Sequence, residues 1–113
     1  MSEKSDIAKI EFIIELIDDI NRIVNRHGGT IQTLDDYEGR HAIMMCLMQT
    51  GETLNKIESQ LMREKLPIDL AYKMRNIIAH DYIGVNKKII AQTIELDIPV
   101  LYKTLKELVQ FLC

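Results

Sequence analysis

Tryptophan is missing from this sequence of 113 residues, and only 5% of its residues are aromatic. This composition disfavours a sheet that stacks nucleic-acid bases on exposed aromatic rings. The two cysteines, Cys46 and Cys113, are too few for a disulfide framework. Since Cys113 is terminal and Cys46 lies in an apolar run, we expect reduced thiols and a cytoplasmic protein.

Long apolar runs and a strong net charge are also lacking. No stretch reaches the roughly 18 apolar residues that span a membrane, and the N-terminal residues do not resemble a signal peptide. The formal net charge is −3, whereas proteins that bind nucleic acid across a wide face are usually basic. Any contact with RNA is therefore expected to be local, or to be built by two copies brought together.

The residues that are present describe a globular chain, with 47% hydrophobic and 27% charged residues. We expect one domain over residues 1–113, because no linker, repeat or low-complexity segment divides the sequence. No segment alternates strongly enough to be a strand. The pattern predicts an all-α fold, an antiparallel bundle of about five helices, at residues 5–27, 35–66, 67–80, 86–96 and 97–112.

The first predicted helix has the clearest pattern. Its core stripe recurs at helical spacing and consists of Ile10, Ile13, Ile17, Ile20 and Val24. A second apolar flank, formed by Phe12, Leu16 and Ile23, predicts contact with more than one neighbour. Arg26 and His27 lie in the last turn, where they suit the negative end of the dipole, and Gly28 can adopt the left-handed cap.

The other helices are predicted from caps and prolines. Asp35 and Glu38 have the spacing of a capping box, and residues 42–48 are apolar on every side, which predicts burial all round. Asn86 is expected to cap the fourth helix. Asp97 is expected to cap the fifth, with Pro99 in its first turn and a stripe of Leu101, Leu105, Leu108 and Leu112.

Residues 74–82, Met-Arg-Asn-Ile-Ile-Ala-His-Asp-Tyr, are the most informative segment for function. At about 100° per residue, the apolar residues of this helix share one side, namely Leu70, Met74, Ile77 and Ile78. Tyr72, Asn76 and His80 fall together on the other side. Arg75 lies at the edge of that side, and its long side chain can reach the same cleft.

These residue types suit the cleavage of a phosphodiester. His80 can take or give a proton near neutral pH, and the guanidinium of Arg75 can fork onto phosphate oxygens. Asn76 can hold the histidine or a phosphate oxygen. RNA carries its own nucleophile, the 2′-hydroxyl, so no metal is required. An arginine and a histidine on a solvated helix face most often have no catalytic role, so spacing alone leaves both interpretations open.

The segment also resembles a known family. Arg75-Asn76-x-x-x-His80 resembles the signature of the HEPN superfamily, and the continuation to Tyr82 resembles its HepT toxin branch. Three more segments resemble that branch: Gly51-Glu52 in the long helix, Tyr-Ile-Gly-Val at residues 82–85, and Asp-Ile-Pro-x-Leu at residues 97–101. The chain departs from the pattern at Ile83, where phenylalanine is often seen, which affects packing rather than chemistry.

The resemblance implies a fold, an activity and partners. It implies a HEPN-like homodimer in which two copies of the motif meet in one cleft, and a toxin that cuts RNA without metal or cofactor. His80 would transfer the proton, Arg75 would stabilise the developing charge, and Asn76 would position the substrate or the histidine. The implied partner is an MntA-type nucleotidyltransferase antitoxin, which would transfer AMP from ATP to Tyr82.

Other charged residues are weaker candidates. Glu52 follows a very apolar stretch, where a buried carboxylate needs a partner, so we expect it to orient Arg75 or His80 or to bond a backbone group. Lys87 and Lys88 follow the motif closely and are possible contacts for RNA phosphates, and Lys73 and Arg63 are weaker candidates for the same role.

The remaining histidines and methionines favour structural roles. We expect His27 to cap the first helix and His41 to lie on a helix surface. The three histidines lack ligand spacing, so no metal site is predicted. The methionines at positions 44, 45 and 48 are expected in the core or in a dimer contact.

Two alternatives to a nuclease stay open. The chain could be a dimeric scaffold that binds a nucleotidyltransferase and cuts nothing, which the acidic net charge favours. It could also be a plain helical interaction protein. The intact pair of Arg75 and His80 favours the nuclease.

Overall fold

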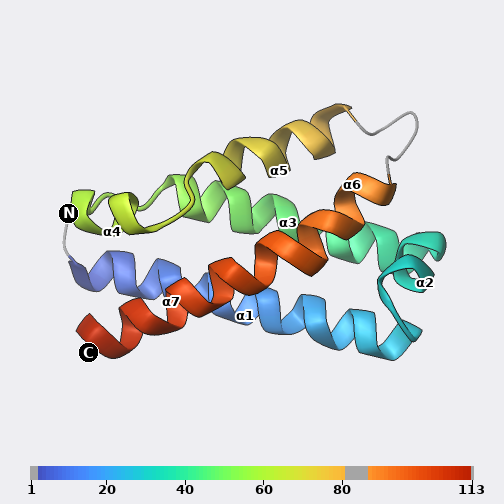
Figure 1. Cartoon of the computed structure of the whole chain (residues 1–113), viewed down its shortest axis with the longest axis horizontal. Coiled ribbons are helices and arrows are strands. Elements are labelled where there is room, and N and C mark those ends of the chain that lie inside the picture. Colours follow the sequence, from blue (N-terminus) through green and yellow to red (C-terminus); the bar gives the residue numbers. More distant parts are fainter. Residues whose placement is uncertain (1–2, 81–86, 113) are drawn as a thin grey trace.

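The computed structural model describes residues 3–80 and 87–112 and is helical almost throughout (Figure 1). Its elements are α1 (Glu3–His27), α2 (Thr30–Asp35), α3 (Tyr37–Asn55), α4 (Gln60–Lys65), α5 (Asp69–His80), α6 (Lys87–Gln92), the π-helix η1 (Thr93–Asp97) and α7 (Ile98–Leu112). No strand occurs within these ranges, so the predicted all-α class is confirmed. None of the described helices combines the length and the apolar character needed to cross a membrane.

The long helices run up and down beside one another (Figure 1). α1 packs against α3 and α7, and α3 in turn carries α5 on its far side. The core between them is made of aliphatic side chains, and the predicted stripes of α1 and α7 supply much of it: Ile10, Ile13, Ile17, Ile20, Leu101, Leu105 and Leu108 are buried. The bundle is therefore held by apolar side chains that recur at helical spacing, as the sequence predicts.

α1 ends as the sequence predicts. Gly28 has a φ of 85°, the left-handed conformation that glycine adopts without strain. Its N–H donates to the carbonyl of Asn25, and the N–H of Gly29 donates to the carbonyl of Val24, which together form a Schellman motif. The prediction that His27 caps the helix is confirmed, because its Nδ1 lies 2.8 Å from the carbonyl oxygen of Ile23.

The prediction of the second helix is wrong at two points. The observed helix α3 begins at Tyr37 with Asp36 as its cap, rather than at Asp35, because residues 30–35 form the separate helix α2. It also ends at Asn55, and a short break separates α3 from α4. Gly39 lets α2 and α3 meet closely, since a Cβ there would lie 2.6 Å from the backbone oxygen of Thr33.

A buried carboxylate produces the break between α3 and α4. Asp6 of α1 is only 2% exposed, and its two oxygens accept the N–H groups of Glu58 and Ser59 at 3.0 and 2.8 Å. Lys9 lies 3.4 Å from the same carboxylate and donates to the carbonyl of Lys56, the C-cap of α3. Side chains of α1 thus supply hydrogen-bond partners for backbone groups at the end of α3 and before the start of α4, which lack partners within their own helices.

The last two predicted helices form one continuous helical stretch. Asp97 does not cap a new helix, because the chain passes through η1 into α7 without leaving helical geometry. The N–H of Ile98 donates to the carbonyl of Thr93, five residues back. This wider π turn precedes Pro99, whose ring would otherwise press on the carbonyl one α-turn earlier. The expected cap at Asn86 lies outside the described residues.

The apolar segment 42–48 is not buried all round. Ile43, Cys46 and Leu47 are buried, but Met45 is 52% exposed, and Met44 is partly exposed. α3 has neighbours on most sides, yet one strip of it faces solvent. Met45, with the partly exposed Met44 and Met48, is the apolar part of that strip, which also carries the exposed His41 and Glu52.

The contacts of Asp6 with Glu58, Ser59 and Lys9, here called the Asp6 clamp, lead to a prediction about stability. Burial opposes the ionisation of Asp6, but the N–H groups of Glu58 and Ser59 together with Lys9 outweigh it and lower the pKa of the carboxyl. Asp6→Asn should lower the free energy of unfolding by about 1–3 kcal/mol at neutral pH. A lowered pKa stabilises the fold above the unfolded value of about 3.9, and this contribution is lost as the pH falls through the folded value.

Urea unfolding followed by circular dichroism at pH 7 and pH 3 measures the effect. The difference between wild type and Asp6→Asn should shrink at the lower pH. Asp19→Asn is the control, because Asp19 pairs with Arg22 on the exposed surface and should change stability by less than about 0.5 kcal/mol. A difference for Asp6→Asn that is equal at both pH values would contradict the clamp.

Candidate functional site

α5 presents one face to the bundle and the other to solvent. Leu70, Ala71 and Met74 are buried, and Tyr72, Arg75 and Asn76 are exposed. This division confirms the predicted core side for the part of the helix whose side chains are described. α5 therefore acts as a rigid support that holds polar side chains outward.

Arg75 and Asn76 are available to a ligand. Neither side chain forms a hydrogen bond or an ion pair within residues 3–80 and 87–112. α5 continues to His80, so positions 72, 76 and 80 follow one another at intervals of about one turn along the helix. The side chain of His80 is not among the described atoms. Tyr82, expected as the modification site, lies outside the described residues.

Two of the lysines expected to contact RNA are already paired. The Nζ of Lys73 lies 2.8 Å from the carboxylate of Asp97, and the Nζ of Lys87 lies 2.7 Å from that of Asp35. Both pairs are solvent-exposed, so RNA phosphate could compete for either lysine at little cost. Lys88 is exposed and makes no such contact with the described part of the chain.

Arg63 has a structural role. Its guanidinium donates to the carbonyls of Asn55 and Ile57, at 3.1 and 2.7 Å. These carbonyls lie at and just beyond the C-terminal end of α3, where helix acceptors lack partners. Arg63 therefore stabilises the turn between α3 and α4.

Glu52 is not the buried carboxylate that the apolar stretch suggested. Its side chain is exposed, and within the described residues it bonds neither Arg75 nor a backbone group. The apolar stretch ends before it, and the helix turns residue 52 outward. Its neighbour Gly51 is buried against α5, where a Cβ would lie 3.3 Å from the backbone oxygen of Ala71.

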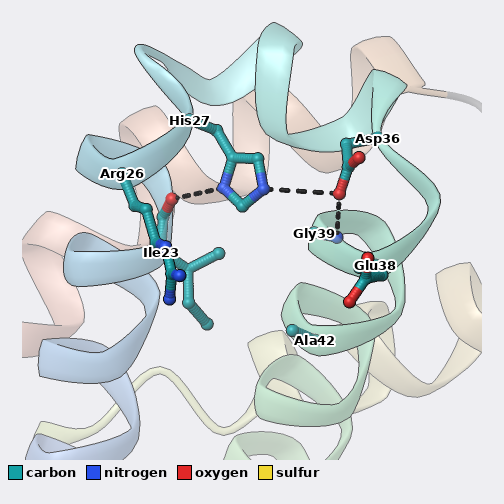
Figure 2. Close-up of a pocket in the computed structure, with 7 residues that line it drawn as sticks. All are labelled: Ile23, Arg26, His27, Asp36, Glu38, Gly39 and Ala42. Carbon is teal, nitrogen blue, oxygen red and sulfur yellow. Dashed lines mark hydrogen bonds and ion pairs between the residues drawn. The ribbon is translucent and has the colours of Figure 1, made fainter.

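A depression of about 390 Å³ lies between the end of α1 and the start of α3, and Figure 2 shows His27 between its two partners. The Nε2 of His27 is 3.3 Å from the carboxylate of Asp36, which also accepts the N–H of Gly39 at 2.8 Å. The hydrogen bond from the N–H of Gly39 lowers the pKa of Asp36; burial opposes it more weakly, and the nearby His27 adds a smaller lowering effect. These contacts cap two helices, and the charged side chains of Arg26 and Glu38 also line the depression.

The structure offers no other reactive centre in the residues that it describes. Burial raises the pKa of the Cys46 thiol, and the charge of Asp19 adds to the effect, so this cysteine is a poor nucleophile. No group of three or more histidine, cysteine or acidic side chains that could hold a metal occurs among the described residues. His41 is exposed on α3, as predicted.

Sequence reasoning missed the acidic partners of the lysines. Asp35 and Asp97 were assigned as helix caps, because aspartate before an apolar run is typical of a cap. Each instead holds a lysine that is distant in sequence, 52 and 24 residues away. No local signal could have found these pairs, since they depend on how α2, α5, α6 and η1 are placed in space.

An all-α up-and-down bundle that exposes an arginine and an asparagine on one packed helix has the architecture of the HEPN class. The model of the family described as Ribonuclease HepT-like matches residues 13–108. The chain belongs to this family, and the resemblance seen in the motifs is confirmed. No curated protein and no solved structure matches the chain significantly.

Proposed function

We propose that the chain is a metal-independent endoribonuclease, the toxin component of a HepT/MntA-type toxin–antitoxin system. The observation that carries the proposal is the exposed face of α5, where Arg75 and Asn76 have no partner among the described residues and position 80 is a histidine. Membership of a family described as HepT-like ribonucleases supports RNA as the substrate.

The proposed reaction uses the 2′-hydroxyl of RNA as the nucleophile. His80 takes its proton, the oxygen attacks phosphorus, and the bond to the 5′-oxygen breaks as that oxygen receives a proton. The products are a 2′,3′-cyclic phosphate and a 5′-hydroxyl. Arg75 binds the non-bridging oxygens where negative charge builds up, and Asn76 positions the phosphate or the histidine. No step requires a metal ion or a cofactor.

A homodimer would complete the site. Near the motif, Lys73 and Lys87 are engaged with carboxylates, so one chain of net charge −3 offers RNA few free cations. A second copy would double the arginines that face the substrate. The exposed Met45 and its partly exposed neighbours on α3 provide apolar surface for such a contact.

The proposed regulator is a nucleotidyltransferase antitoxin that transfers AMP from ATP to Tyr82. Tyr82 follows His80 by two residues, so the hydroxyl that would carry AMP belongs to a residue next to the motif in the sequence. The added phosphate would compete with an RNA phosphate for the guanidinium of Arg75. Charge and bulk would then both oppose the binding of RNA.

A scaffold that binds the transferase without cutting RNA is the second candidate. It is favoured by the acidic net charge and by the engagement of Lys73 and Lys87 in ion pairs. RNA cleavage by the purified protein in the presence of EDTA separates the two candidates.

His80→Ala should abolish RNA cleavage and growth inhibition while the fold is retained, because the proton-transfer group is lost. Arg75→Ala should lower kcat by about 10²–10³, the loss typical of one transition-state contact. His41→Ala is the matched control, because His41 is an exposed histidine on α3. Cleavage by His80→Ala at the wild-type rate, or a complete loss of wild-type cleavage in EDTA, would rule out the proposed chemistry.

Met45→Glu should convert the dimer to a monomer and reduce RNA cleavage with it, since a charge is costly in an apolar interface. Sedimentation at micromolar concentration measures the first effect. Val100→Glu is the control, because Val100 is similarly exposed but lies on α7. A monomeric wild type with full activity would refute the dimer, and dissociation by Val100→Glu alone would place the interface elsewhere.

Tyr82→Phe should remain folded and should gain no AMP, because the acceptor oxygen is absent. Wild type and variant are incubated with the cognate transferase and ATP, and the intact masses are compared. Tyr72→Phe is the control, since Tyr72 is an exposed tyrosine on α5 and should leave modification unchanged. If Tyr82→Phe gains AMP as readily as wild type, the acceptor is another residue.

A further inference from the structure

Gly51 lies where the backbones of α3 and α5 come close together. A Cβ at this position would meet the backbone oxygen of Ala71 at 3.3 Å and the Cβ of Met74 at 3.6 Å. The distance to the oxygen of Ala71 is shorter than the distances found in most Cβ contacts of real proteins. A backbone oxygen inside a helix cannot rotate away as a side chain can, so a larger residue here would push α5 outward by a few tenths of an ångström.

The atom that Gly51 faces belongs to the turn that carries Arg75. In an α-helix the carbonyl of one residue accepts the N–H of the residue four further on. The oxygen of Ala71 is therefore the acceptor for the backbone N–H of Arg75. A displacement of this carbonyl is passed directly to the backbone from which the guanidinium projects.

Few other contacts hold α5 in place. Within the described part of the chain, α3 is the element on which α5 packs most extensively, and Figure 1 shows α5 lying along α3 on the side away from α1. On its other flank, Lys73 reaches Asp97 through an ion pair with both side chains partly exposed, 48% and 34%. Such a pair restrains a helix weakly. The surface of α3 around Gly51 therefore decides where α5 sits.

We propose that Gly51 is a positioning residue for Arg75, acting by setting the separation of α3 and α5. It touches neither substrate nor a reacting group. The inference rests on the proposed nuclease function, in which Arg75 stabilises the charge that builds up on the phosphate. A small outward shift of α5 moves that guanidinium from its working position and slows the chemical step.

Gly51→Ala is the test, measured by single-turnover cleavage of a short fluorescent RNA. A misplacement of 1 Å can cost about 100-fold in rate, so a shift of a few tenths should lower the rate at saturating RNA roughly 3- to 10-fold, with little change in the RNA concentration for half-maximal rate. The same change in an Arg75→Ala background should cause no further loss, because the group that Gly51 positions is already absent.

Gly39→Ala is the matched control on the same helix. A Cβ at Gly39 would meet the backbone oxygen of Thr33 at 2.6 Å. Gly39 lies near the start of α3, whereas Gly51 lies near its end. Gly39→Ala should lower the melting temperature more than Gly51→Ala does, yet below that temperature it should cleave RNA at the wild-type rate. The contrast separates a loss of stability from a loss of positioning.

Each outcome decides a different point. Absence of cleavage by the wild type would overturn the nuclease function itself. With an active wild type, an unchanged rate for Gly51→Ala, or an unfolded Gly51→Ala protein, would overturn the positioning role. An equal loss in the presence and absence of Arg75 would show that Gly51 acts through another group, and would also overturn it.

Discussion

The backbone contact between α3 and α5 is the constraint on which the candidate site depends. Gly51 brings α3 against the carbonyl of Ala71, one turn before Arg75, and Met74 fills the space beside it. α3 is itself fixed by the aliphatic core that it shares with α1. The motif helix is thus the outer layer of a stack of rigid helices, and its exposed residues are held by packing on the opposite face.

Side-chain caps from distant residues hold the ends of these helices. Asp6 satisfies N–H groups between α3 and α4, Arg63 satisfies carbonyls at the same break, and Asp36 joins His27 to the start of α3. Several cations are used in this way or in ion pairs, while Arg75 has no partner among the described residues. In an acidic chain, this leaves Arg75 as a cation of α5 that is free to bind a phosphate, and it supports the proposal that two copies are needed to hold RNA.

The helical class, the core stripes of α1 and α7, and the left-handed Gly28 could be predicted because each depends on residues close together in sequence. The breaks could not. Residues 56–59 leave the helix because Asp6, some fifty positions earlier, binds two of their N–H groups. Asp97 has the local appearance of a cap, but the chain remains helical there through a π turn, and its carboxylate holds Lys73.

For the site, the family motif and the face of α5 on which Tyr72, Arg75 and Asn76 lie follow from the amino-acid sequence, because helical spacing alone decides which residues share a face. Tertiary structure decided which charges are free. It turned Glu52 to solvent, paired Lys73 and Lys87 with aspartates from other helices, and brought Gly51 against the backbone of α5. These outcomes depend on distances between helices, and the packing of the whole core sets those distances. They therefore cannot be predicted from the local pattern of residues.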